Sequence, residues 1–267
     1  MRPVAVIGQL ARDLFVGQPP RIGGGPWHAA RALRALGRPA AVAAKCGVED
    51  RRAYLSQLSA LGLPVTLAVG ERTTAFTFRY EAGRRVMGVE AIGEPWGARE
   101  ALCPAVRTAG WVHVAPLLRS DFPVETLAAL AAGRRLLLDG QGLVRVPREG
   151  PLELDRDFDP RVLQHISILK LAEEEALVVL DRLDVREIAA LAVPEVLVTL
   201  GEAGSLVYSG GRLERVAARA IPVEATGAGD GFCVAYLLAR SEGHAPASAA
   251  RRATALVAAV LDARRQR

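Results

Sequence analysis

The chain alternates short apolar runs with longer amphipathic stretches along nearly its whole length. Short apolar runs are typical of strands that are buried on both faces, and apolar positions three or four residues apart predict helices. The alternation therefore predicts a mainly parallel sheet covered by helices on both sides. The predicted strands are Val4–Gly8, Ala40–Cys46, Val65–Val69, Trp111–Ala115, Leu136–Asp139, Ile166–Leu169, Val196–Leu200 and Ser205–Tyr208, and the predicted helices are Trp27–Leu36, Arg51–Leu61, Arg99–Arg107, Val124–Ala132, Glu173–Leu180, Ala228–Arg240 and Pro246–Ala263.

One segment early in the chain breaks this alternation. Thr73–Tyr80 alternates small or polar residues with aromatic ones, and after Glu81–Gly83 the chain returns as Arg84–Ala91. Two such strands joined by a short turn predict a hairpin. A hairpin inside an α/β series indicates a small sheet that projects from the main body as a lid. Extra strands on one edge of the main sheet are the alternative.

These patterns predict one α/β domain over residues 1–267, a three-layer α/β/α body with a small β-hairpin lid. The lid is expected from residues of about 11–20 and 73–91. Phe76 and Phe78 would share one face of it, and exposed apolar patches of this kind seldom stay uncovered. We therefore expect a homodimer formed through the lid.

Composition excludes several classes of protein. The 267 residues are 51% hydrophobic with a net charge of only +5, which excludes an intrinsically disordered chain. No apolar run approaches the ~20 residues that a membrane span needs; Ala253–Leu261 comes nearest, and Asp262 ends it. The apolar start, Val4–Gly8, is too short for a secretory signal and is predicted to be the first strand. A cytoplasmic protein without a membrane partner is expected.

The distribution of charged residues, cysteines and histidines argues against nucleic-acid binding and against a metal site built from cysteine and histidine. Lys45 and Lys170 are the only lysines among 34 basic residues, and the arginines are scattered among acidic residues. Aromatic residues make up only 5% of the chain, so a clustered basic surface with aromatic residues, as nucleic-acid binding needs, is not expected. The three cysteines lie far apart and the four histidines form no pair at helical spacing, which argues against a metal site built from them.

The most informative stretch is Ile221–Phe232, which contains Thr226-Gly227-Ala228-Gly229-Asp230 and precedes an apolar helix. Glycines at 227 and 229 let backbone N–H groups converge where the helix presents its positive dipole end. Such a loop forms an anion hole suited to a phosphoryl group. Asp230, in the first helical turn, is suited to accept a proton from an attacking hydroxyl. A glycine-rich turn with an acidic first-turn residue is the structural alternative.

A second glycine-rich stretch lies near the N-terminus. Gly23–Gly25 meets a predicted helix with Pro26 near its start and Gly37 after its end, which is typical helix punctuation. Asp13 follows the first strand, at the edge where open α/β sheets bind ligands. Each feature alone is a weak signal.

The two stretches together resemble the two sequence patterns of the PfkB (ribokinase-like) family of carbohydrate kinases, and Val198–Ser205 resembles the nucleotide-binding strand and loop of that family. The resemblance implies a ribokinase-like fold and phosphorylation of a sugar or cyclitol hydroxyl by ATP and Mg²⁺. Asp230 would be the general base, with Gly227, Ala228 and Gly229 as the anion hole. It further implies that Asp13, Gly24, Gly25 and His28 contact substrate hydroxyls, that Thr199, Gly201, Gly204 and Thr226 form the nucleotide site, and that Glu175 places Mg²⁺ through water.

Three positions depart from the family pattern. His28 and Ala172 stand where the family usually has Asn, and Glu224 stands where it usually has Asp, near a monovalent-cation site of many members. His28 can still exchange one hydrogen bond with a hydroxyl, whereas Ala172 offers no polar atom. A nucleoside kinase on the same fold and a catalytically silent nucleotide- or sugar-binding protein therefore remain as alternatives.

One more arginine is a candidate site residue. Asp139–Arg145 follows a predicted strand on the expected ligand side and resembles an Asp-x-Gln-Gly-x-x-Arg variant found in some branches of the family. This resemblance implies that Arg145 belongs to the substrate site, where it would reach a phosphate. A surface arginine is the alternative.

Overall fold

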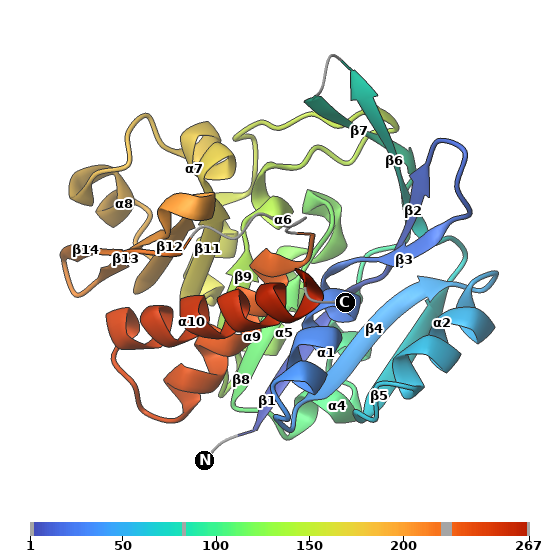
Figure 1. Cartoon of the computed structure of the whole chain (residues 1–267), viewed down its shortest axis with the longest axis horizontal. Coiled ribbons are helices and arrows are strands. Elements are labelled where there is room, and N and C mark those ends of the chain that lie inside the picture. Colours follow the sequence, from blue (N-terminus) through green and yellow to red (C-terminus); the bar gives the residue numbers. More distant parts are fainter. Residues whose placement is uncertain (1–2, 82–83, 220–225, 266–267) are drawn as a thin grey trace.

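The central sheet is mostly parallel and runs in the order β14-β13-β12-β11-β9-β8-β1-β4-β5 (Figure 1). The computed structural model describes residues 3–81, 84–219 and 226–265. The two pairings among β12, β13 and β14 are antiparallel, and the other pairings of this sheet are parallel. Its strands are β1 (Val4–Gln9), β4 (Ala41–Gly47), β5 (Val65–Gly70), β8 (Trp111–Ala115), β9 (Arg135–Asp139), β11 (Ile168–Ala172), β12 (Glu195–Thr199), β13 (Ser205–Ser209) and β14 (Arg212–Val216).

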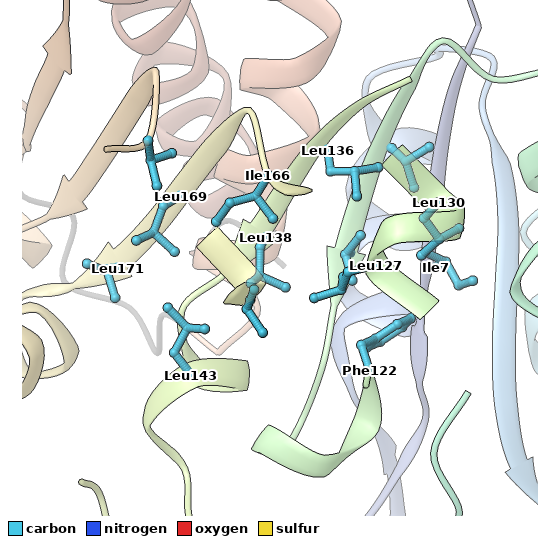
Figure 2. Packing of buried hydrophobic residues seen from close by; sticks show 14 of the residues in the cluster. Ile7, Phe122, Leu127, Leu130, Leu136, Leu138, Leu143, Ile166, Leu169 and Leu171 are labelled. Atoms are coloured by element: carbon cyan, nitrogen blue, oxygen red, sulfur yellow. The ribbon is translucent and has the colours of Figure 1, made fainter. Parts of the chain in front are cut away.

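Successive residues of a strand point to opposite faces of the sheet. The strands carry apolar residues on both faces, so helices cover both. One face packs on α1 (Gly25–Ala35), α2 (Arg51–Ser59), α9 (Ala228–Ser241) and α10 (Pro246–Arg265). The other packs on α3 (Ala98–Ala101), α4 (Pro104–Arg107), α5 (Val124–Ala131), α7 (Glu173–Val179) and α8 (Val185–Ala190). Figure 2 shows part of this second core, where Leu127 and Leu130 of α5 face Leu136 and Leu138 of β9. The predicted three-layer α/β/α architecture is confirmed.

The predicted hairpin belongs to a second, smaller sheet in the order β10-β7-β6-β2-β3. Its strands are β2 (Ala11–Phe15), β3 (Arg21–Gly23), β6 (Thr74–Glu81), β7 (Arg84–Ala91) and β10 (Gly150–Pro151). This sheet projects at one end of the central sheet (Figure 1). It is separate from the nine-stranded sheet, so the alternative of extra edge strands is wrong.

The aromatic face of the second sheet is covered within the same chain. Phe76 and Phe78 are 2% and 4% exposed, and they pack with Leu117 and Leu118 after β8. Phe78 also stacks on Phe15 with ring centroids 4.8 Å apart. The burial of both rings removes the reason for which a homodimer was expected.

Other differences from the sequence prediction are local. The helix predicted over Arg99–Arg107 is wrong as a single helix, because it is interrupted at Cys103 before Pro104. Proline disfavours the helical conformation of the preceding residue and lacks the N–H that would continue the ladder. Elements that the sequence prediction missed are α6 (Gln141–Val144), α8, β3, β10, β14 and the 3₁₀ turns Arg119–Asp121, Pro160–His165 and Gly201–Ala203. Among the described helices, none is long and apolar enough to cross a membrane.

Candidate active site

The start of α9 forms the centre of the candidate site. Gly227 is the N-cap residue with φ of 80°, a left-handed conformation that glycine adopts without strain. Ala228 and Gly229 occupy the first turn, where backbone N–H groups have no partner inside the helix. Asp230 completes this turn. The structure thus contains the helix N-terminus and glycine loop that the sequence predicted.

The N-terminal glycine stretch lies against this helix start. A Cβ atom at Gly25 would lie 2.9 Å from Oδ1 of Asp230, and a Cβ atom at Gly227 would lie 2.6 Å from Nδ1 of His28. The two motifs, about 200 residues apart in sequence, are therefore in contact. Side chains at either glycine would separate α1 from α9.

The remaining predicted substrate residues lie beside the second sheet. Asp13 is on β2, and its carboxylate packs against Gly23 of β3, where a Cβ atom would come within 2.6 Å of both carboxylate oxygens. Gly24 lies against the backbone of Gln9 and Leu10, which connects the central sheet to β2. Asp13 and Gly24 therefore lie next to Gly23 and Gly25, and Gly25 is the residue of this stretch that lies against Asp230.

A cavity of about 720 Å³ lies at the start of α9. Its volume is within the range of small-molecule and cofactor sites. Of the predicted residues, the cavity brings together Gly227, Ala228 and Gly229, the loop predicted as an anion hole and called the anion-hole loop below, with Asp230, Arg145, Glu175, Thr199, Gly201 and Gly204. The rest of the lining comes from several strands, loops and helices. It consists of Asp139, Gln141, Lys170, Ala172, Glu173, Glu174, Glu202, Ala218, Arg219, Phe232 and, on α10, Thr254, Val257, Ala258 and Leu261.

The floor of this cavity is a cluster of buried charges. Asp139 at the end of β9 and Lys170 on β11 form an ion pair, with Nζ 3.5 Å from each carboxylate oxygen. Glu175, in the first turn of α7, accepts a hydrogen bond of 2.8 Å from the backbone N–H of Ala172. Burial raises the pKa of Glu175, and the charge of Lys170 opposes this rise.

Asp230 has an unusual protonation equilibrium. Burial raises its pKa to about 7, the charge of Asp139 adds to this rise, and the charges of Lys170 and Arg145 oppose it. No described residue forms a hydrogen bond with Oδ1, which is shielded from solvent. A carboxylate with a pKa near neutrality and a free oxygen is suited to take up a proton during a reaction.

Asp139 also belongs to a cluster that the sequence spacing did not indicate. Ligand atoms of His113, Asp139 and Cys233 lie within 4.8 Å of one another, and all three residues are buried. Burial lowers the pKa of His113 to about 4, so the ring is neutral. The ammonium of Lys170, paired with the same Asp139, opposes the binding of a second cation there. We assign no metal to this cluster.

The residues predicted for the nucleotide are partly assembled. Thr199 donates a hydrogen bond of 3.3 Å to the carbonyl of Leu171, and Gly204 packs against the Val216 carbonyl, where a Cβ atom would lie at 2.0 Å. Thr226 precedes α9 in a turn and does not line the cavity. Glu224, predicted near a monovalent cation, lies outside the described residues.

Lys170 and Asp139 were not predicted as site residues. Lys170 lies in the apolar run Ile168–Leu171. A lysine at the end of an apolar strand usually points into solvent, so it gave no reason to expect a site residue. Its isolation was a signal: the chain has one other lysine, and burial of a charged residue in a strand implies a partner. The partner, Asp139, is 31 residues away in sequence, so only the fold identifies it.

Comparisons with known proteins identify solved structures of similar fold. A search of curated proteins gave no match. A pyrophosphate-dependent kinase in the ribokinase family, solved with a pyrophosphate analogue and myo-inositol, superposes with a TM-score of 0.82 at 25% identity, covering 95% of this chain and 93% of that one. A nucleoside kinase from Burkholderia thailandensis, solved with inosine, gives 0.74 at 21% identity, covering 96% and 89%.

A ribokinase from Thermotoga maritima has the same fold, with a TM-score of 0.71 at 16% identity over 96% of this chain and 92% of that one. The expected ribokinase-like fold is thereby confirmed. The model of the pfkB family of carbohydrate kinases matches residues 20–265, which include both glycine motifs and the cavity lining. On this evidence the chain belongs to the pfkB carbohydrate kinase family, and it is a phosphotransferase of ribokinase-like fold.

Proposed function

We propose that this protein transfers the terminal phosphoryl group of a phosphate donor to a hydroxyl of a small sugar or cyclitol. The observation that carries the proposal is the environment of Asp230. Among the described residues its buried Oδ1 has no hydrogen-bond partner, Oδ1 lies against Gly25 of the N-terminal glycine stretch, and burial raises the pKa of Asp230 to about 7. A structural first-turn aspartate would be ionised and bonded to the helix N–H groups.

In the proposed step the acceptor hydroxyl attacks the terminal phosphorus of the donor. A bond forms between the hydroxyl oxygen and phosphorus, the bond from phosphorus to the bridging oxygen breaks, and the hydroxyl proton passes to Asp230. The backbone N–H groups of Gly227, Ala228 and Gly229 stabilise the negative charge on the phosphoryl oxygens. The shortened donor leaves with the bridging oxygen and its electron pair.

The cavity is proposed as the donor site, and ATP is the donor that the family resemblance implies. Thr199, Gly201 and Gly204 line this cavity, and apolar atoms of Val257 and Leu261 on α10 offer a surface for a base. Glu175 and Glu174 supply hard carboxylate oxygens at the same cavity, which fits Mg²⁺ held through water. Bound Mg²⁺ would neutralise donor phosphates.

Inorganic pyrophosphate is a second candidate donor. The structures that match at 25% identity include the pyrophosphate-dependent kinase described above, and that similarity exceeds the similarity to the nucleoside kinase and the ribokinase. Three cations, Lys170, Arg145 and Arg219, line the same cavity as Gly227, Ala228 and Gly229. Together they supply positive charge that could bind the two phosphates of pyrophosphate, a donor without a nucleobase.

A polyol acceptor is favoured by the residues on the side of the second sheet. Asp13 offers carboxylate oxygens to adjacent hydroxyls, and His28 offers one ring nitrogen near the anion hole. A nucleoside is the alternative acceptor, since a nucleoside kinase shares the fold. The silent-protein alternative is opposed by the intact Gly227–Asp230 loop and by the raised pKa of Asp230.

The test is a phosphoryl-transfer assay that crosses donors with acceptors. ATP, GTP and pyrophosphate are each offered with pentoses, hexoses, inositols and nucleosides. Release of the nucleoside diphosphate is followed for ATP and GTP, and release of orthophosphate is followed for pyrophosphate. We expect acceptor-dependent release with a sugar or an inositol. Turnover only with nucleosides would show that the acceptor is a nucleoside and not a sugar or cyclitol. No turnover with any combination of donor and acceptor would support a catalytically silent protein.

The pKa of Asp230 sets an expected pH dependence. The base acts in its ionised form, and its free-enzyme pKa is about 7. We therefore expect kcat/KM to fall about tenfold per pH unit below this value and to level off above it. Initial rates between pH 5 and 9 check this; a profile that is flat down to about pH 5 would contradict a base with a raised pKa.

A further inference from the structure

We propose that a second cavity, lined by Trp111, Arg135 and Arg240, binds the phosphate group of a small anionic ligand outside the active site. The cavity has a volume of about 460 Å³, and Gly110 and Gly243 complete its lining. This volume is within the range of small-molecule sites. No sequence motif indicated this second cavity, and its role is independent of the proposed function.

The second cavity lies at the amino ends of the parallel strands. Trp111 is the first residue of β8 and Arg135 the first residue of β9, whereas Asp139 of the active site ends β9. Arg240 lies in the last turn of α9, ten residues after Asp230, which corresponds to about 15 Å along the helix axis. The two cavities share no lining residue, so a ligand in the second one would not occupy the active site.

The first support is the charge of Arg135. Its side chain is exposed, and its guanidinium carbon lies 5.0 Å from the centroid of the Trp111 ring. Within the described part of the chain, no carboxylate forms an ion pair with this guanidinium and no residue accepts a hydrogen bond from it. An arginine is always protonated and has five N–H donors. Arg135 therefore offers a full charge and its donors to a ligand.

The second support is the fixed orientation of Arg240. Its guanidinium donates to both carboxylate oxygens of Glu195 and to the carbonyl of His244. These bonds use three of its five N–H donors, and two remain for a ligand. Glu195 is 8% exposed and also accepts a hydrogen bond of 2.6 Å from the hydroxyl of Tyr236. The guanidinium is thus held in place before a ligand arrives, which lowers the entropic cost of binding.

The third support is the sign of the charge around the second cavity. None of its five lining residues is acidic. The acidic neighbours of the lining residues are each paired with an arginine, Glu195 with Arg240 and Glu242 with Arg38. Arg134 donates to backbone carbonyls and to no described carboxylate, so its charge adds to that of the cavity. The charge favours an anion, and phosphate oxygens match the planar donors of arginine.

A contact that only stabilises the fold explains this arrangement less well. Arg31 and Trp27 make such a contact, with 5.7 Å between the guanidinium carbon and the ring centroid, and neither residue lines either cavity. Trp111 instead has two guanidinium carbons near its ring centroid, that of Arg135 at 5.0 Å and that of Arg240 at 5.8 Å. Two like charges so close to one ring repel each other, and a bound anion would replace this repulsion by attraction.

The experiment follows the second cavity by ¹⁹F NMR of the full-length protein labelled with 5-fluorotryptophan. The chain has three tryptophans, so three signals are expected, and Trp111→Phe identifies the signal of Trp111. The probes are pyrophosphate and the phosphate monoester glucose 6-phosphate, each titrated at constant ionic strength. We expect the Trp111 signal to shift along a saturating curve with a Kd of about 1 mM or lower for at least one probe.

Saturation by either probe supports the site, and the tighter probe identifies the source of the phosphate group. A shift that grows linearly with both probes, or that sodium chloride reproduces, would overturn the proposal, because it would reflect general screening of the arginines. The readout does not involve turnover, so an inactive protein would leave this test intact.

Arg135→Gln tests the cation directly. Since Arg135 has no ion pair in the described part of the chain, the variant should be as stable as the wild type. We expect at least about tenfold weaker binding of the tighter probe at Trp111, because one contact to a charged group is lost. Arg31→Gln is the matched control: it removes the same charge from beside Trp27 and should leave the affinity unchanged. Equal affinity of Arg135→Gln and wild type, or an equal loss in both variants, would refute the site.

Discussion

Asp230→Asn is expected to lower kcat by on the order of 10²–10⁴-fold while the protein stays folded. The amide has nearly the same shape as the carboxylate but cannot accept the proton of the attacking hydroxyl. Donor binding should hold or tighten, because one negative charge disappears beside the phosphates. Since the Asp230 carboxylate is buried and Oδ1 has no described partner, its replacement by an amide should cost little stability.

The matched control is Asp121→Asn. Asp121 is also buried with a pKa raised to about 7 by burial, but it accepts hydrogen bonds from the backbone N–H groups of Leu117 and Leu118 outside the cavity. We expect this variant to lose stability and to keep kcat per folded molecule. Wild-type turnover by Asp230→Asn would refute the general base, and equal loss in both variants would show a structural effect.

Gly229→Ala is expected to impair both donor binding and rate. The added Cβ would lie 3.3 Å from Nζ of Lys170, which is tighter than an ordinary contact, so the ammonium or the loop must shift. Because the loop N–H groups are proposed to bind the phosphoryl group, we expect kcat/KM for the donor to fall by at least about 10²-fold. Steady-state kinetics with varied donor concentration measures this.

Gly231→Ala is the control within the same helix. A Cβ atom there would meet Ala32 at 3.6 Å and Val257 at 3.7 Å, which are ordinary contacts. Alanine is favoured over glycine inside a helix by roughly 1 kcal/mol, so the variant should be equally or more stable. It should keep its donor kinetics. If Gly231→Ala is as impaired as Gly229→Ala, rigidity of α9 rather than the anion hole explains the loss.

Much of the fold followed from local pattern. The eight predicted strands are present because each is an apolar run bounded by turns, and buried parallel strands have this signature. The errors arose where tertiary contacts or a single residue decided the structure. Pro104 divided a predicted helix, and the short strand β10 forms only by pairing with β7.

The site was predictable where it is contiguous in sequence. The loop at Gly227–Asp230 and the stretch at Gly23–Gly25 were identified by spacing, and the fold brings them into contact. Lys170 and Asp139 were missed because an ion pair between two strands leaves no spacing pattern. The expected exposure of Phe76 and Phe78 was wrong because residues 117–118, distant in sequence, cover them. Arg145 lines the donor cavity, and its predicted contact with substrate stays a prediction.

The most direct test of the central claim is ³¹P NMR of a reaction with wild-type protein and with Asp230→Asn, using the best donor and acceptor. Proton transfer to Asp230 during attack by a hydroxyl predicts a phosphate monoester of the acceptor, formed in step with loss of the donor. The same signal should grow on the order of 10²–10⁴-fold more slowly with Asp230→Asn. Donor loss that yields orthophosphate without a monoester, or a monoester formed equally fast by the folded variant, would contradict the account.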